Sequence, residues 1–177
     1  ISFNWGNLLS NNRLGISTNR GGFVTASNFN RSCNELRALN RYKVCLTSSE
    51  LVIIPDDMGS NSAGEQVVSC PDCKGMAFDG LNIWTSSSNT NQVYKIDLSR
   101  EYSEHLTELC PGSLCHQNPK TPVITATVSV GNNPQGVEFD GARVWVANQD
   151  SDTVTVIDAS DSSVLATVSV GDAPTTV

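Results

Sequence analysis

One motif occurs three times in this chain, and it limits the possible folds more than any other feature. The copies are Gly136–Asn148, Gly75–Ser87 and Gly15–Ser27, which align without a gap and begin about 60 residues apart. In the two clearest copies, Asp140-Gly141 and Asp79-Gly80 separate short stretches of alternating apolar residues. Glycine supplies the positive φ that a tight hairpin turn requires. Each copy is therefore predicted to be two strands joined by a turn.

Two more strands are predicted after each hairpin, because short runs of Val, Ile and Leu recur there between clusters of turn-forming residues. Each repeat would then be one four-stranded antiparallel sheet. The additional strands are predicted at 52–54 and 66–68 in the first repeat, at 93–97 and 124–130 in the second, and at 153–158 and 164–170 in the third.

The first two repeats are longer than the third because each carries an insertion. The insertion at 28–50 contains Ser32–Glu35, which has the form of a helix capping box, and predicts a short helix over 33–42. The insertion at 99–122 has Tyr102, Leu106 and Leu109 at helical spacing and predicts a second short helix.

The repeats define the expected organisation of the chain. Residues 1–14 precede the first motif, and alternating apolar residues there predict a lone strand that is a candidate to close a ring. The first repeat is placed at 15–74, the second at 75–135, and the third at 136–177 with the start of a further repeat.

Four strands per repeat are typical of the blades of a β-propeller. The segments Pro134–Gly141, Val144–Asn148, Val154–Asp158 and Val164–Gly171 resemble the YVTN family of β-propeller repeats, with Trp145 at the position of the signature tyrosine. The resemblance is strongest over 134–174, fair over 75–97 and weakest over 15–74. It implies an all-β propeller with more blades than three, and it implies no single function.

Three blades do not close a ring, so an open blade flank is expected at each end of the array. Because the sequence stops inside a repeat, we expect either further blades after Val177 or association between copies of the chain. Association that is head to tail and does not close would give a filament.

The composition narrows the class of partner. The formal net charge of the 177-residue chain is −7 and no basic stripe is present, which argues against nucleic acid as a partner. Apolar residues make up 38 % of the chain, enough for a core, but no apolar run approaches the length of a membrane span. No membrane span is therefore expected in this segment.

Six cysteines lie in three close pairs, Cys33/Cys45, Cys70/Cys73 and Cys110/Cys115. Pairs at short spacing favour three disulfides and an oxidising compartment, so the protein is expected to be secreted, extracellular or on the cell surface, with the periplasm as a further possibility. No leader sequence precedes Ile1, and we expect that one was removed or lies outside this sequence.

Other roles for the cysteines stay open. Cys110 and Cys115 followed by His116 resemble a covalent haem site with a wide gap, in which His116 would be the axial ligand. Cys70 and Cys73 have the spacing of a redox dithiol, and the four cysteines of these two pairs would suffice for a zinc site. Disulfides with no cofactor are the favoured interpretation.

Polar loop residues are the default candidates for a binding site. The loops after the second and fourth strands of a blade lie on one face of a propeller, and they carry residues suited to bind a ligand or to form solvated turns. The candidates are Asn148, Gln149, Asp150, Ser87, Ser88 and Asn89.

No nucleophile–base set emerges from the sequence. Both histidines, His105 and His116, fall in the second insertion, and Asn30 opens a glycosylation sequon. The sequence therefore favours a secreted or cell-surface propeller that binds a partner or builds an extracellular assembly. The alternative is a redox or lyase-type enzyme on a propeller scaffold. Trp84, Trp145 and Val24 share one alignment column and are predicted to be buried between blades.

Overall fold

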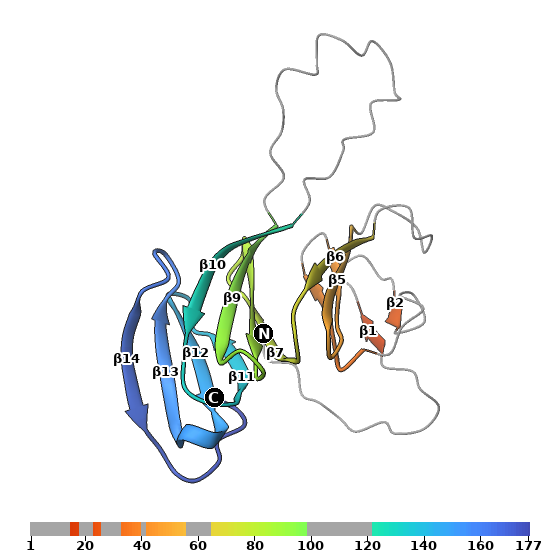
Figure 1. Ribbon diagram of the computed structural model, residues 1–177. Coiled ribbons are helices and arrows are strands. Elements are labelled where there is room, and N and C mark those ends of the chain that lie inside the picture. The colour runs from red at the N-terminus through yellow and green to blue at the C-terminus, as the bar shows by residue number, and fades with distance from the viewer. Residues whose placement is uncertain (1–14, 18–22, 26–32, 40–41, 56–64, 99–121) are drawn as a thin grey trace, which may run out of the picture. The chain divides into compact units, whose positions relative to one another are not determined.

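The computed structural model describes residues 15–17, 23–25, 33–39, 42–55, 65–98 and 122–177 of the chain. Among these residues are three four-stranded antiparallel sheets and one two-stranded sheet, so the fold is all-β (Figure 1). The chain forms two compact units, Ile1–Cys73 and Lys74–Val177, and each is described by itself. No helix in the described part of the chain is long and apolar enough to cross a membrane.

The first unit contains a sheet that we call blade 1. Its strands are β3 (Glu35–Leu39), β4 (Tyr42–Leu46), β5 (Glu50–Pro55) and β6 (Gln66–Ser69), paired in that order. The two short strands β1 (Gly15–Ser17) and β2 (Phe23–Thr25) pair only with each other. Half of the strands of blade 1 therefore come from the segment 28–50, which the sequence had predicted to be an insertion.

The helix predicted over 33–42 is wrong. Leu36 lies opposite Cys45 in the β3–β4 ladder, and Cys45 lies opposite Val52 in the β4–β5 ladder. These three side chains are buried and form one apolar cluster. A capping box satisfies only the first turn of a helix, whereas the strand conformation gives Leu36 a complete cross-strand neighbourhood.

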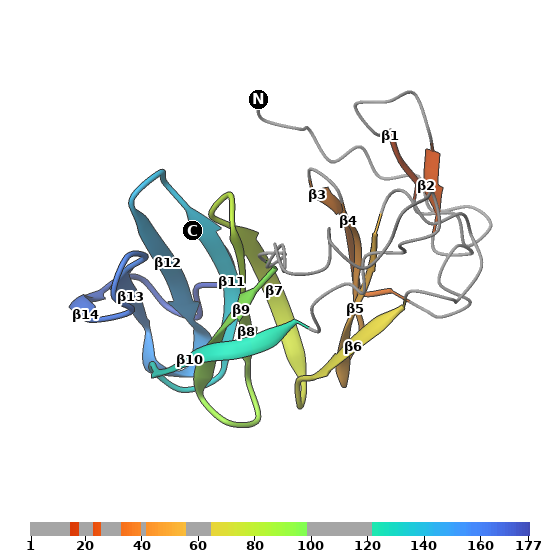
Figure 2. The same cartoon turned by 90° about the horizontal axis from the view of Figure 1, so that it is seen from above.

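The second unit contains two sheets with the predicted strand pattern. Blade 2 consists of β7 (Cys73–Phe78), β8 (Asn82–Ser87), β9 (Gln92–Asp97) and β10 (Val123–Ser129). Figure 2 shows it beside the following sheet from above.

Blade 3 follows with the same order of strands. It consists of β11 (Pro134–Phe139), β12 (Arg143–Asn148), β13 (Thr153–Asp158) and β14 (Val164–Ser169), with the short 3₁₀ turn η3 (Gln149–Ser151) between β12 and β13. The helix predicted inside 99–122 and the strand predicted at 1–14 lie outside the described residues.

The core of the second unit lies between blade 2 and blade 3. One face of each sheet contributes to it, because residues at alternate positions along a strand point to the same face. Blade 2 contributes the side chains that surround Trp84, and blade 3 contributes Val137, Val144, Val146 and Ile157. Burial of this cluster is the main hydrophobic contribution to the packing of blade 2 against blade 3.

The predicted burial of the tryptophan column is confirmed for Trp84 and is wrong for Trp145. Trp84 has no exposed surface, because blade 3 covers the face of blade 2 on which it lies. Trp145 occupies the same position in blade 3 but lies on the face turned away from blade 2, and it is only half-buried. The side chain of Val24 lies outside what the structure describes.

Candidate functional site

The candidate residues after β12 belong to a network of polar groups at the end of blade 3. Asn148 is fully buried, and its Nδ2 donates to the hydroxyls of Thr153 and Thr155 at 3.1 and 2.8 Å. Gly131 lies in the loop that connects β10 to β11, and we call such a loop between two blades a joint. A Cβ at Gly131 would come within 2.8 Å of the Asn148 side chain, so only glycine fits where the joint passes over Asn148. The Asn148 Oδ1 has no hydrogen-bond partner among the described residues.

Gln149 and Asp150 hold the joint that connects blade 2 to blade 3. The Nδ2 of Asn133 donates to Gln149 Oε1 at 3.0 Å and to Asp150 Oδ1 at 3.1 Å. In return, the backbone N–H groups of Gln149 and Asp150 donate to the carbonyls of Asn133 and Asn132. Four hydrogen bonds between two loops fix their relative position, which is a structural role.

The other three candidates lie at the end of β8 and directly after it in blade 2. Ser87, the counterpart of Asn148, is fully buried, Ser88 is half-buried and Asn89 is exposed. The structure brings Gln149 and Asp150 together through Asn133. Asn89 and Asp150 are the candidates with side chains open to solvent.

The sequence did not predict the two residues whose side chains hold the joints by hydrogen bonds to the backbone. The Oδ1 of Asn91 accepts from the backbone N–H of Asn133 at 2.9 Å, and the Oδ1 of Asp152 accepts from that of Ala173 at 2.8 Å. All four residues have a φ between 50° and 54°, in the left-handed region. The repeated joint sequences, Gly-Asn-Asn-Pro at 131–134 and Gly-Asp-Ala-Pro at 171–174, were the available signal, since Asn and Asp tolerate this conformation.

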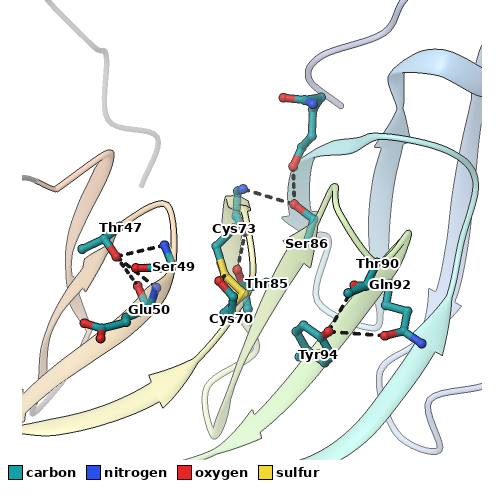
Figure 3. Close-up of a disulfide and its surroundings, with 12 residues drawn as sticks. Thr47, Ser49, Glu50, Cys70, Cys73, Thr85, Ser86, Thr90, Gln92 and Tyr94 are labelled. Carbon is teal, nitrogen blue, oxygen red and sulfur yellow. Dashed lines mark hydrogen bonds between the residues drawn. A yellow bond between two sulfur atoms is a disulfide. The ribbon is translucent and has the colours of Figure 1, made fainter.

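The joint that follows blade 1 carries a disulfide. Cys70 and Cys73 are bonded to each other, and both are fully buried (Figure 3). The backbone N–H of Cys70 donates to the carbonyl of Ser49 at 2.9 Å, just as Val130 and Val170 donate to the turns of blades 2 and 3. The disulfide therefore occupies the place at which each of the other two joints is held by a hydrogen bond from its backbone to an Asn or Asp side chain.

The cysteines of the described region give two of the three pairs expected from the sequence, Cys33–Cys45 and Cys70–Cys73. Because Cys70 and Cys73 are bonded to each other, they offer no thiolates for the four-thiolate zinc site. No cluster of three or more His, Cys, Asp and Glu side chains occurs among the described residues. Cys110, Cys115, both histidines and the sequon at Asn30 lie outside those residues.

A second repeated cluster lies at the opposite end of the hairpins. In blade 2, Asp79 accepts from the backbone N–H groups of Leu81 and Asn82 and from the Trp84 indole Nε1, at 2.9, 2.7 and 2.8 Å. The Asp-Gly turn is thereby bonded to the tryptophan of the next strand. The carboxylate thus holds the turn in place, and the geometry gives it no acid–base role.

The corresponding cluster in blade 3 has the same geometry. Asp140 accepts from the backbone N–H groups of Ala142 and Arg143 and from the Trp145 indole at 2.9, 2.7 and 2.8 Å. The indole, followed by the two N–H groups, holds the pKa of Asp140 below its ordinary value. Burial alone would raise the pKa of Asp79, but its hydrogen bonds outweigh that effect and lower it as well.

Comparisons with known proteins define the class of fold. The sequence matches no protein-family model, and it matches no curated protein. The structure is similar to Hsv2 of Kluyveromyces lactis, with 10 % identity over 95 % of this chain and 52 % of that chain and a TM-score of 0.58. It is similar to the hydrazine synthase of Kuenenia stuttgartiensis, with 14 % identity over 78 % of this chain and 35 % of that chain and a TM-score of 0.56.

A third similar structure is AztD of Citrobacter koseri, with 11 % identity over 93 % of this chain and 43 % of that chain and a TM-score of 0.55. These are β-propeller proteins, so the chain is an all-β protein built of propeller blades. Identities this low show the fold alone. The chain spans between 35 % and 52 % of the length of these three proteins, and its membership of the YVTN family stays a prediction.

Proposed function

We propose that this chain is part of a secreted or cell-surface β-propeller that works as a binding or assembly module. The observation that carries this proposal is the apolar face that blade 3 turns away from blade 2. Val168 on that face is 48 % exposed, whereas its counterpart in blade 2, Val128, is 6 % exposed. Val164, Leu165 and Val170 on or next to β14 are exposed as well. Exposed apolar side chains grouped along the outermost strand of a sheet support an interaction site there.

The proposed compartment rests on the disulfides. Cys33–Cys45 staples β3 to β4, and Cys70–Cys73 closes the joint after blade 1. Disulfides of this structural kind form and persist where the surroundings are oxidising. A secreted, extracellular or cell-surface location is therefore proposed, and the acidic charge of −7 suits a protein that must stay dispersed there.

The support for a non-catalytic role comes from how the polar side chains are used. Asn148 is bonded to strand β13, and Gln149 and Asp150 are bonded to the neighbouring loop. Asp79 and Asp140 are bonded to turns and tryptophans. Binding at the loop face would fall to Asp150 and Asn89, whose side chains are open to solvent. Head-to-tail association that does not close would make the chain a filament subunit.

Sedimentation velocity over a wide range of protein concentrations tests the assembly proposal. The chain is expected to associate through the exposed face, and Val168→Asp is expected to abolish that association. Val123→Asp is the matched control, since Val123 is 49 % exposed but lies at the start of β10, outside this face. A folded monomer at every concentration, or equal effects of both substitutions, contradicts assembly through this face.

The alternative of a redox enzyme is tested on the same protein sample by intact mass and visible absorption. Three disulfides would add about six mass units on full reduction, two hydrogens for each bond, and would leave the visible spectrum empty. A haem bound to Cys110 and Cys115 would instead give a Soret band and a covalent increase in mass. The second result would replace the binding-module proposal with the redox one.

A further inference from the structure

We propose that two copies of this chain pair edge to edge through β14, antiparallel and about a two-fold axis at Val168. This inference rests on the proposed function and deepens it, because it names the partner as a second copy and the contact as the free edge of blade 3. The two four-stranded sheets would thereby join into one continuous sheet.

Strand β14 is the free edge of blade 3. Among the described strands it pairs only with β13 (Figure 1). All six of its side chains are exposed, so both faces of the strand are open as well as its edge. A free edge presents backbone N–H and C=O groups that a further strand can bind.

The register of β14 on β13 determines which backbone groups lie at that edge. The Val170 N–H donates to the Asp152 carbonyl, in line with the register of the β13–β14 ladder. Opposite residues in an antiparallel ladder alternate between hydrogen-bonded and non-hydrogen-bonded pairs. Val168 therefore directs its N–H and C=O toward β13, whereas Thr167 and Ser169 direct theirs toward the free edge. These are the groups that an incoming strand would meet.

The segment 166–170 is complementary to its own copy when the two run antiparallel about Val168. The opposed pairs are then Ala166 with Val170, Thr167 with Ser169 and Val168 with Val168. The edge-directed residues of each copy thereby fall in hydrogen-bonded pairs, which exchange N–H and C=O groups. Apolar side chains oppose apolar ones on one face and hydroxyls oppose hydroxyls on the other, which are favourable cross-strand pairs.

An irregularity at the start of β14 limits the pairing to this segment. The register shifts between Val156 and Ile157, and Leu165 is left without an opposite residue in β13. Such a bulge bends the strand and ends regular pairing. At the other end, β14 stops at Ser169 and Gly171 begins the next joint. The contact is therefore short, and we expect it to form and dissociate reversibly.

The charge distribution favours a second copy at this edge. The chain carries a net charge of −7, so its copies repel each other on average. No charged residue occurs between Asp161 and Asp172, which makes β14 an uncharged strip. Edge strands are ordinarily protected from pairing by charged residues or proline, and β14 has neither. In the proposed register Asp172 falls opposite Val164 and not opposite another acid.

Strand β10 carries the same local sequence but does not offer the same edge. Residues 126–130 repeat the run Ala-Thr-Val-Ser-Val of 166–170. Val128 is 6 % exposed and belongs to the core between blades 2 and 3, whereas Val168 is 48 % exposed. A partner strand centred on Val128 would find that side chain already covered. The pairing therefore falls to β14, and β10 provides a matched control.

Sedimentation velocity of Thr167→Pro over a range of concentrations tests the proposed contact. The substitution removes an N–H that points away from β13, and proline is tolerated on an edge strand at such a position. It is expected to weaken association at least about tenfold, because both symmetry-related hydrogen bonds of that N–H are lost. Thr127→Pro makes the same change in β10 and is expected to leave association unchanged within about twofold. Unchanged association of Thr167→Pro, or equal losses in both variants, contradicts the pairing.

Cysteine cross-linking tests the register and does not depend on the folding of the proline variants. Val168→Cys places two thiols in a non-hydrogen-bonded pair with Cα atoms about 4.5 Å apart, which is within the range of a disulfide. Mild oxidation is expected to give a covalent dimer. Val170→Cys is the control, because residue 170 of the two copies would lie more than about 13 Å apart along the strands. Cross-linking at Val170 as fast as at Val168, or at neither position in associated protein, overturns the register.

The outcomes separate this inference from the proposed function. If association persists in Thr167→Pro but is lost in Val168→Asp, the apolar face binds without the edge, so the inference fails and the assembly function stands. Growth into filaments has the same meaning, because a two-fold contact closes on itself as a dimer. If Val168→Cys cross-links and the purified chain carries covalent haem, the inference stands and the binding-module proposal fails.

Discussion

At the scale of single residues, one carboxylate organises each hairpin of the second unit. Asp79 and Asp140 each accept two backbone N–H groups of the turn and the indole N–H of a tryptophan five residues ahead. The turn geometry and the tryptophan orientation are therefore set by the same side chain. Hydrogen bonds to a charged acceptor are stronger than those between neutral groups, so these residues matter more to stability than their partly exposed positions indicate.

Asp79→Ala is expected to destabilise the second unit by about 1–2 kcal/mol after allowance for solvent screening. The substitution leaves the Trp84 indole N–H and the N–H of Asn82 without their acceptor. Urea denaturation of the variant and the parent measures the difference. Asp140→Ala is the matched comparison and should cost less, because Trp145 is already partly exposed to water. Equal losses would mean that burial of the tryptophan does not strengthen the bond.

The same contacts predict how stability depends on pH. The pKa of Asp79 in the folded state lies below its ordinary value of 3.8, and the pKa of Asp140 is lowered too. Their contribution is therefore complete above pH 3.8, and it is lost as the pH falls through the lowered folded-state pKa values. Urea midpoints measured from pH 6 to pH 2 should fall in the acid range. The fall should be shallower in Asp79→Asn, and an identical profile would exclude a role for this carboxylate.

At the scale of elements, the glycines at the entry of each blade decide how closely neighbouring innermost strands approach. Gly75 faces the backbone of β11 and Gly136 faces the backbone of Thr175 and Thr176, whereas a Cβ on Gly171 would meet nothing within 4 Å. Position within the repeat, and not the mere presence of glycine, therefore determines which of these residues is required.

Gly75→Ala is expected to destabilise the second unit by about 1–3 kcal/mol, because backbone atoms of Gln135 and Val137 have no room to yield. Gly171→Ala is expected to change stability by less than about 0.5 kcal/mol. Thermal or urea unfolding of both variants gives the comparison. A tolerated Gly75→Ala would show that blades 2 and 3 are spaced more loosely than the structure has them.

The strands of blades 2 and 3 were predictable because every signal agreed there. Alternating apolar residues and Asp-Gly turns gave all eight strands to within one or two residues. In blade 1 the strands predicted at 52–54 and 66–68 are confirmed as β5 and β6. Strands β3 and β4 were missed, because the Ser32–Glu35 pattern imitates a helix start while the partners of Leu36 lie in the following strand.

The candidate site was predictable only in part, for a related physical reason. The sequence located Asn148, Gln149 and Asp150 at the correct loop, but it could not show that Asn133 reaches them across the joint. Asn91 and Asp152, whose backbones are in the left-handed conformation, accept hydrogen bonds from segments that lie far away in the chain. The periodicity of apolar residues gives no information about such contacts. The half-exposed state of Trp145 likewise depends on its neighbours and not on its own strand.

At the scale of the whole molecule, blade 3 covers one apolar face of blade 2. Blade 3 covers this face of blade 2, whereas on blade 3 the corresponding face leaves Trp145 half-buried and Val168 exposed, although the two faces share their register. A repeat protein of this kind buries a continuous core only by adding units. The open face is thus a consequence of the repeat itself, and it is where we propose that a partner binds.

Residue-specific oxidation of Trp84 and Trp145 in the unmodified chain, diluted until it is monomeric, tests this account most directly. The two residues are equivalent by sequence position and register, and blade 3 covers Trp84 whereas Trp145 stays half-buried. Trp84 is expected to react at least about tenfold more slowly than Trp145, because its reaction requires blades 2 and 3 to open. Equal rates in the folded monomer would contradict the stacked blades and the open face on which the proposed function rests.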